Sequence, residues 1–160
     1  MIAPEEGAFE FRGPVVGPLT RDEFIAAVVG FDVYAAFPDL AGNMHDVRAC
    51  PITPGRVWVT TQIAGTNTGD SMLGSATGTR VVTPPQAVSV VFDERGKIVR
   101  FNIGYPMDRT VGTTGGLGGI FGLLYGIGKG LPFPEAQPWT MSKRYRLFNI
   151  VGGVLRKLRK

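Results

Sequence analysis

FPDL at residues 37–40 opens the stretch of sequence that decides the fold. The stretch continues with RVWVTTQIAGTNTGD at 56–70 and ends with TGTRVVTPPQAVSVVFDERGKIVRFNIGYPMD at 77–108. Runs of β-branched and aromatic residues alternate here with turn-forming residues, a pattern that predicts strands joined by turns. The last run ends at a single acid, Asp108. We therefore expect a curved sheet that brings one carboxylate to its rim, an arrangement suited to an apolar pocket with one acid or base.

The strongest strand expected in this block is Arg56–Gly65, where side chains of different character alternate along the chain. Ala87–Phe92 predicts another strand, and a turn at Asp93–Gly96 returns the chain antiparallel through Lys97–Tyr105. The remaining strands that we expect are shorter and less regular, at residues 7–12 and 44–50.

Helical signals precede the block. Thr20 and Glu23 have the spacing of a capping box, and the apolar residues that follow are spaced as on one face of a helix, which predicts a helix over 21–29. A second short helix is expected over 31–37, ended by Pro38. A chain with helices early and antiparallel strands late has the α+β pattern.

The chain has 160 residues, of which 44% are hydrophobic and 19% charged, enough for one domain with a buried core. Its single cysteine, Cys50, excludes an internal disulfide and gives no metal cluster. Residues 142–160 carry seven basic side chains and no acid, whereas residues 1–141 carry a net charge of −3. This division argues against a uniformly basic nucleic-acid binder, and we expect no nucleic-acid partner.

Two segments follow the block. Residues 110–140 are expected to form a Gly/Pro-rich apolar extension, in which positions 110–128 hold eight glycines and no charge. Residues 141–160 predict a basic amphipathic helix. Such a helix suits an anionic membrane surface or an acidic protein partner, but it can also pack on its own domain with its basic face in water. The acidic start of the chain lacks the apolar core of a signal peptide, so we expect a soluble intracellular protein, with peripheral membrane attachment as the alternative.

The order of these motifs resembles the SnoaL-like polyketide cyclase family of the nuclear transport factor two-like superfamily. The resemblance rests on FPDL, GTNTG at 65–69, TGTRV at 77–81, FDERGKI at 92–98 and the strand that ends at Asp108. It implies a cone-shaped, curved antiparallel sheet wrapped by helices around an apolar pocket, formed here by residues 1–109, and a homodimer. The long N-terminal helix of the family is expected to be absent from this chain.

The resemblance also implies site residues. Asp108 occupies the position of the family's acid, which acts on a proton next to a carbonyl, and Asp39 in FPDL is the second carboxylate carried over. Asn67 replaces the family's histidine; it cannot titrate, but it can hydrogen-bond a carbonyl or enolate oxygen. Tyr105, near the end of the same strand as Asp108, can donate a hydrogen bond to that oxygen.

Each of these residues also has a structural interpretation. Asp108 acts as a base only if an apolar pocket raises its pKa, and it can instead pair with Arg109 or Arg100 or cap the turn that follows. Asp39 follows a proline, where aspartate commonly caps or turns the chain. Tyr105 can equally be a core aromatic residue.

One face of the strongest strand supplies further candidates. Trp58, Thr60 and Gln62 share this face and can line the cavity as substrate-binding residues, or Trp58 can belong to the core while the polar pair is solvated. His45 is the single histidine, and beside Asp46 it is more typical of a surface or packing residue than of a catalyst.

Two functions are compatible with these features, and whether the protein is an enzyme stays open. The first is a pocket protein for a small apolar carbonyl-bearing ligand, which can catalyse proton abstraction with cyclisation or isomerisation through a single aspartate and needs no cofactor or metal. The second is a non-catalytic binding or assembly module that docks a membrane-associated or protein partner through residues 110–140 and 141–160.

Overall fold

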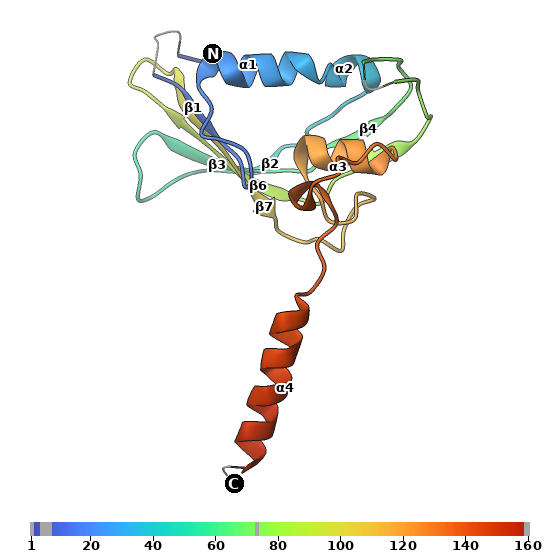
Figure 1. Ribbon diagram of the computed structural model, residues 1–160. Helices are drawn as coiled ribbons and strands as arrows, with labels where there is room; N and C mark the ends of the chain where they lie inside the picture. Colours follow the sequence, from blue (N-terminus) through green and yellow to red (C-terminus); the bar gives the residue numbers. More distant parts are fainter. Residues whose placement is uncertain (1, 4–7, 73, 159–160) are drawn as a thin grey trace.

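Figure 1 shows the computed structural model, which describes residues 2–3, 8–72 and 74–158. The chain forms a body of strands and helices from which the C-terminal helix projects, so the predicted α+β class is confirmed. The strands are β1 (Glu10–Arg12), β2 (His45–Ala49), β3 (Arg56–Thr61), β4 (Ala64–Thr66), β5 (Arg80–Val82), β6 (Gln86–Phe92) and β7 (Ile98–Pro106). The helices are α1 (Arg21–Gly30), α2 (Val33–Ala36), α3 (Gly119–Gly126), the 3-10 helix η1 (Pro134–Ala136) and α4 (Lys143–Leu158).

The main sheet has the strand order β1-β7-β6-β3-β2. The pairs β2–β3, β3–β6 and β6–β7 are antiparallel, and the last of them is the hairpin that the turn at 93–96 predicted. β1 instead pairs parallel with β7 and places Phe11 opposite Phe101. The sheet is therefore mixed, and the prediction of a wholly antiparallel sheet was wrong at this edge. Alternation identifies a strand, but it does not reveal which distant strand becomes the neighbour.

The strand expected over Arg56–Gly65 is divided into two. After Thr61 the backbone leaves the main sheet: the amide of Gln62 donates to the carbonyl of Gly42 at 3.0 Å, and that of Ile63 donates to Thr83 Oγ1 at 3.0 Å. The chain then pairs as β4 with β5 in a separate two-stranded sheet. This second sheet carries the GTN part of the GTNTG motif away from the main sheet and toward α2.

Helix α1 begins where its capping box predicted. The amide of Thr20 donates to Glu23 Oε2 at 2.8 Å, and the amide of Glu23 donates to Thr20 Oγ1 at 3.4 Å. The helix lies across one face of the main sheet (Figure 1), where the Phe24 ring stacks on Phe11 with 4.8 Å between ring centroids. Phe24 also meets the edge of Phe101 at 5.9 Å. This aromatic cluster fixes α1 against β1 and β7.

The most buried cluster lies at the other end of the body and joins α2, β5 and α3. Its largest members are Phe37, Val81, Leu123 and Ile127. Gly126 permits this contact, because a Cβ atom there would lie 2.6 Å from Cγ1 of Val81. The Gly-rich segment is thus packed into the core of the body. The cluster joins residues from both sides of position 109, where the sequence suggested a domain boundary.

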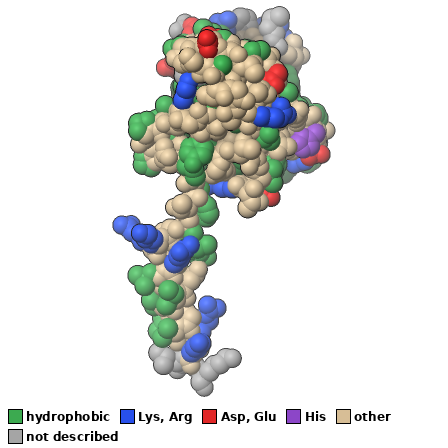
Figure 2. All heavy atoms as spheres, turned by 90° about the vertical axis from the view of Figure 1, so that its right-hand side faces the viewer, with side chains coloured by type: hydrophobic (Ala, Val, Ile, Leu, Met, Phe, Trp, Pro, Cys, Tyr) green, Lys and Arg blue, Asp and Glu red, His purple; other side chains and the backbone are tan. Residues whose placement is uncertain are grey.

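Helix α4 extends away from the body in both views (Figures 1 and 2). Its large apolar side chains are exposed, with Leu147 at 62% and Phe148 at 72% of their full accessibility. Figure 2 shows hydrophobic and basic side chains along it. Among the residues that the structure describes, none of the helices combines the length and apolar character needed to cross a bilayer.

Candidate functional site: an apolar pocket between two helices

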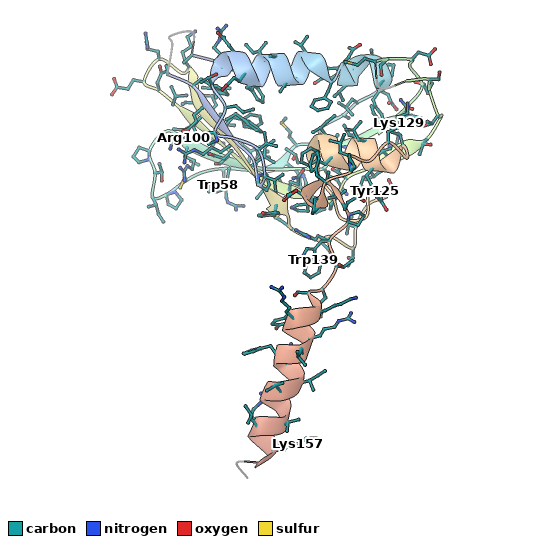
Figure 3. All side chains as sticks on the ribbon, viewed as in Figure 1. Trp58, Arg100, Tyr125, Lys129, Trp139 and Lys157 are labelled. Atoms are coloured by element: carbon teal, nitrogen blue, oxygen red, sulfur yellow. The ribbon has the colours of Figure 1, made fainter. Side chains whose placement is uncertain are left out.

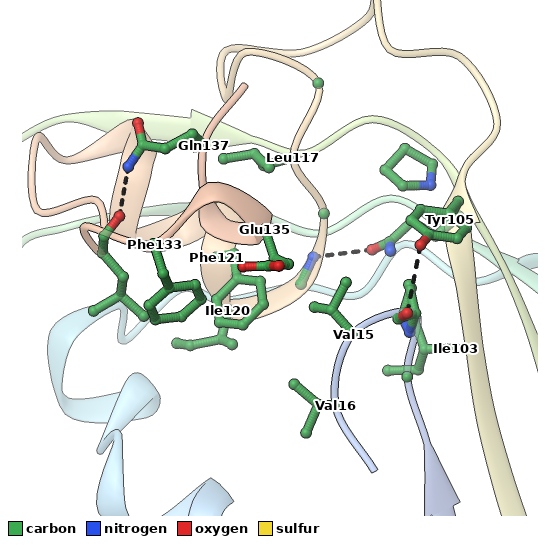
Figure 4. Close-up of a pocket in the computed structure, with 18 of the residues that line it drawn as sticks. Val15, Val16, Ile103, Tyr105, Leu117, Ile120, Phe121, Phe133, Glu135 and Gln137 are labelled. Carbon is green, nitrogen blue, oxygen red and sulfur yellow. Dashed lines mark hydrogen bonds between the residues drawn. The ribbon is translucent and has the colours of Figure 1, made fainter. Parts of the chain in front are cut away.

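A cavity of about 800 Å³ lies between α1, the end of β7, α3 and the chain from Leu131 to Thr140, and we call it the α1–α3 pocket. Its walls are mainly aliphatic and aromatic (Figure 4). Phe121 and Phe133 meet edge to face in one wall, with 5.7 Å between their centroids. The other large apolar contributors are Phe24, Phe31, Ile103, Leu117 and Ile120. A cavity of this size and character fits the usual dimensions of small-molecule sites.

Gln86 is the buried polar side chain in the wall of the pocket, with 4% of its surface accessible. Its Nε2 donates to the carbonyl of Gly104 at 3.1 Å, and its Oε1 accepts from the amide of Gly119 at 2.9 Å. A Cβ atom on Gly118 would overlap the Gln86 amide. Gln86 therefore ties β6, β7 and the start of α3 together and fixes the distance between two walls of the pocket.

Of the three predicted catalytic residues, Tyr105 lines the pocket. Its hydroxyl donates to the carbonyl of Pro14 at 3.4 Å, and its ring is more than half exposed (Figure 4). The guanidinium of Arg109 lies over this ring at 5.8 Å from its centroid and over the ring of Trp139 at 5.2 Å. Arg109 and Glu135 are the charged side chains among the described residues that line the pocket.

Asp108 lies next to the pocket but does not line it. Its exposed carboxylate accepts hydrogen bonds from the amide of Thr110 at 2.9 Å and from Thr110 Oγ1 at 2.6 Å. These bonds lower the pKa of Asp108 below its ordinary value, because they stabilise the ionised form. The carboxylate of Asp108 thus caps the turn after β7, which is one of the structural interpretations that the sequence allowed.

Asn67 and Asp39 join the two motifs that carry the family resemblance. Asn67 is buried, with its Nδ2 donating to the carbonyl of Ala36 at 2.9 Å and its Oδ1 accepting from the amide and the hydroxyl of Thr77, each at 2.9 Å. Asp39 accepts from the amide of Thr66 at 2.6 Å and from its hydroxyl at 2.9 Å. GTNTG is therefore bound to the end of α2 and to FPDL, and none of its residues lines the α1–α3 pocket.

The structure places Trp58, Thr60 and Gln62 away from the pocket. Val57 of β3 pairs with Val90 of β6, and Val90 pairs with Phe101 of β7. Paired residues lie on the same face of a sheet, and Phe101 contacts α1. The odd-numbered positions of β3 therefore face the helix. Trp58 and Thr60 then point to the opposite face of the sheet, where Figure 3 labels Trp58, and Gln62 follows after the strand has ended. None of the three lines the α1–α3 pocket. His45 is exposed, with Nε2 3.7 Å from a carboxylate oxygen of Asp46.

Half of the pocket lining comes from segments that the sequence did not mark as part of a ligand pocket. These are the turn at residues 13–16, α3 and the chain from 131 to 140, of which the last two lie in the extension that the sequence suggested for docking a partner. The helical spacing of Leu117, Ile120 and Phe121 was a usable signal, since it marks an apolar face that must be covered. In the described ranges, no three His, Cys, Asp or Glu side chains lie close enough together to hold a metal ion.

The lowered pKa of Asp39 predicts a specific sensitivity to acid. Its hydrogen bonds to Thr66, and more weakly the charge of Arg80, hold the pKa of the folded state below 3.8. Ionised Asp39 therefore contributes stability above that pH, and the contribution disappears as pH falls through the lowered pKa. We expect the urea midpoints of the wild type and Asp39→Asn to differ at about pH 5 and to converge toward about pH 2.5. A difference that stays constant over this range would contradict the assignment.

A solved structure of another protein shares this arrangement of strands and helices. The match to AclR, a candidate hydroxylase from Streptomyces galilaeus, has a TM-score of 0.54 at 20% identity and covers 84% of this chain and 73% of that protein. The fold is nuclear transport factor two-like. The nuclear transport factor two-like fold that the resemblance implied is thus confirmed, whereas the cone shape of the sheet stays a prediction.

Two further solved structures match over less of the chain. One is a candidate SnoaL-like polyketide cyclase from Jannaschia sp. CCS1, at 16% identity and a TM-score of 0.47, covering 64% of this chain and 65% of that protein. The other is IdmH, a candidate polyketide cyclase from Streptomyces antibioticus, at 20% identity and a TM-score of 0.48, covering 64% and 73%. No family model matches the chain, and no curated protein does. At 20% identity, the likeness to AclR shows the fold alone.

Proposed function

We propose that this protein binds a small apolar, carbonyl-bearing molecule in the α1–α3 pocket. The observation that carries the proposal is the cavity of about 800 Å³ with aromatic and aliphatic walls. Burial of an apolar ligand against these walls contributes about 25 cal/mol for each Å² removed from water. The Gln86 hydrogen bonds support the proposal as well, because they hold two of the walls in place before a ligand arrives.

Proton abstraction followed by cyclisation or isomerisation is the reaction that the resemblance implies. A general base must lie within hydrogen-bonding reach of the proton that it removes, and Asp108 is held by Thr110 outside the pocket wall. The geometry therefore supports ligand binding best, and the catalytic role of Asp108 stays a prediction. Asp108→Asn is expected to leave ligand affinity unchanged; it would abolish turnover if Asp108 is the base.

Filling the pocket tests the binding proposal. Ala27 on α1 is half-buried and lines the cavity, whereas Ala26 on the same helix is exposed and does not. We expect Ala27→Trp to weaken binding of N-phenyl-1-naphthylamine, a neutral apolar fluorophore, at least tenfold, because the indole occupies the space that the ligand needs. Ala26→Trp is the matched control and should bind the fluorophore as the wild type does.

Fluorescence titration of the two variants and of the wild type distinguishes the pocket from other apolar surfaces. The exposed side chains of α4 can also bind the fluorophore, but both variants keep them unchanged. Equal affinity in all three proteins would overturn the proposed site.

The exposed amphipathic helix α4 favours a second function, attachment to an anionic membrane surface. Its exposed apolar side chains include Leu147, Phe148 and Leu155, and basic residues occur at both its ends. A helix of this composition can lie in the interface of a bilayer with its apolar face buried and its basic side chains near anionic headgroups. A homodimer stays a prediction; the sheet face that carries Trp58 is the surface that we propose for it.

A further inference from the structure

The charged groups of the α1–α3 pocket indicate what kind of ligand it takes. Arg109 is half-buried in the pocket wall, and its guanidinium forms no ion pair with a carboxylate in the described ranges. The neighbouring acid, Asp108, turns away to Thr110. Glu135, the other charged lining residue, is exposed on η1 and lies beyond ion-pair distance of Arg109. A cation with no anionic partner thus borders an apolar cavity.

Two aromatic rings hold this cation in place. The guanidinium carbon of Arg109 lies 5.8 Å from the Tyr105 ring centroid and 5.2 Å from that of Trp139, within the range of cation–π contacts. Gly116 allows the chain to pass close by, because a Cβ atom there would lie 2.9 Å from Cβ of Arg109. Its φ of +85° is also one that a side chain would disfavour. The loop and the rings together restrict where the guanidinium can go.

A guanidinium is a planar group whose N–H bonds point outward along its edge. Arg109 carries five N–H donors in that plane, and none of them donates to another residue that the structure describes. Planar N–H donors of this kind match the two oxygens of a carboxylate, or the oxygen of an ionised enol or phenol. An apolar cavity beside such a group is complementary to a molecule with one apolar part and one acidic part.

We propose that the α1–α3 pocket selects ligands with an apolar ring system and a single anionic oxygen group, and that Arg109 binds that group. This inference rests on the proposed binding function and names the class of ligand. Glu135 limits the charge that is tolerated: with one cation and one carboxylate in the wall, a monoanion is accommodated and a polyanion is repelled. Arg109 is a binding residue in this proposal.

The test compares three naphthalene derivatives of nearly equal size in calorimetric titrations: 2-naphthoate, the neutral 2-naphthamide and the cationic 2-naphthylmethylammonium. We expect the wild type to bind the carboxylate at least tenfold more tightly than the amide, and the amide more tightly than the cation. Arg109→Met keeps an unbranched apolar side chain and should make the carboxylate and the amide bind equally. Arg48→Met, on the exposed strand β2, changes net charge by the same amount and should keep the wild-type preference.

The outcomes distinguish the role of Arg109 from the binding function of the pocket. If the wild type binds the acid and the amide equally, or the cation best, the role of Arg109 is overturned while the pocket remains. If none of the three binds although N-phenyl-1-naphthylamine occupies the pocket, the proposed ligand class is overturned; if the fluorophore does not bind the pocket either, the proposed function itself fails. An equal loss of preference in Arg109→Met and Arg48→Met would assign the effect to net charge and overturn the inference. The wild-type order of affinities tests the proposal even if Arg109→Met does not fold.

Discussion

Replacing Asn67 with alanine is expected to lower the free energy of unfolding by about 2–4 kcal/mol. The side chain is 1% exposed and makes three hydrogen bonds, to Ala36 and Thr77. The substitution would remove all three bonds, each of which contributes about 0.5–1.5 kcal/mol, while the Ala36 carbonyl still accepts from the amide of Gly69 at 3.3 Å. Urea denaturation followed by circular dichroism measures the change.

The control for this prediction is Asn149→Ala on the exposed face of α4, which should change stability by no more than about 0.5 kcal/mol. Asn67 was predicted from the sequence as a donor to a substrate oxygen, a role that truncation would impair without unfolding the protein. A variant Asn67→Ala that is as stable as Asn149→Ala would therefore contradict the structural role and restore the catalytic one.

Removal of residues 143–160 is expected to reduce binding to vesicles with anionic lipids by at least about 100-fold. The sequence places seven basic residues in this segment, and each contributes about 1 kcal/mol near a negatively charged surface. If only three of them engage, the loss is already about 3 kcal/mol, or about 100-fold in affinity. Co-sedimentation with vesicles measures the effect.

Two full-length variants separate the contributions of α4. Phe148→Ser with Leu155→Ser removes apolar area and keeps the charge, whereas Arg156→Gln with Lys157→Gln removes charge and keeps the apolar face. Both should weaken binding, and high salt should weaken binding by the wild type but have less effect on the charge variant. Binding that is independent of salt and of residues 143–160 would rule out this function. Binding to an acidic protein in place of vesicles would assign α4 to a protein partner.

Local signals predicted much of the fold. The capping box of Thr20 and Glu23 marked the start of α1, and the turn at 93–96 gave the hairpin of β6 and β7. Contacts between segments that are distant in the sequence were harder to predict. The parallel contact of β1 with β7 depends on residues about ninety positions apart, and the break after Thr61 depends on a hydrogen bond to Thr83. Neither partner can be inferred from the pattern of one segment.

The candidate site was harder to predict, because polar residues in a motif have the same sequence signature whether they bind a substrate or the backbone. Asp39 and Asn67 stand in the motifs that gave the resemblance, and their hydrogen bonds show that they hold those motifs to each other. The pocket instead collects side chains from segments distant in sequence, such as Phe24, Ile103 and Phe133. No local sequence pattern marked Arg109 as a site residue, because its place in the site depends on its contact with Trp139, thirty residues later.

The wall of the pocket ends at Thr140, and α4 begins at Lys143. Three residues of extended chain span at most about 10 Å. A bilayer that held the whole of α4 at its surface would therefore keep Thr140, in the wall of the pocket, within about 10 Å of that surface. Molecules with an apolar ring and an acidic group concentrate at that boundary. The protein would then collect its ligand by a search in two dimensions, from the lipid rather than from the surrounding water.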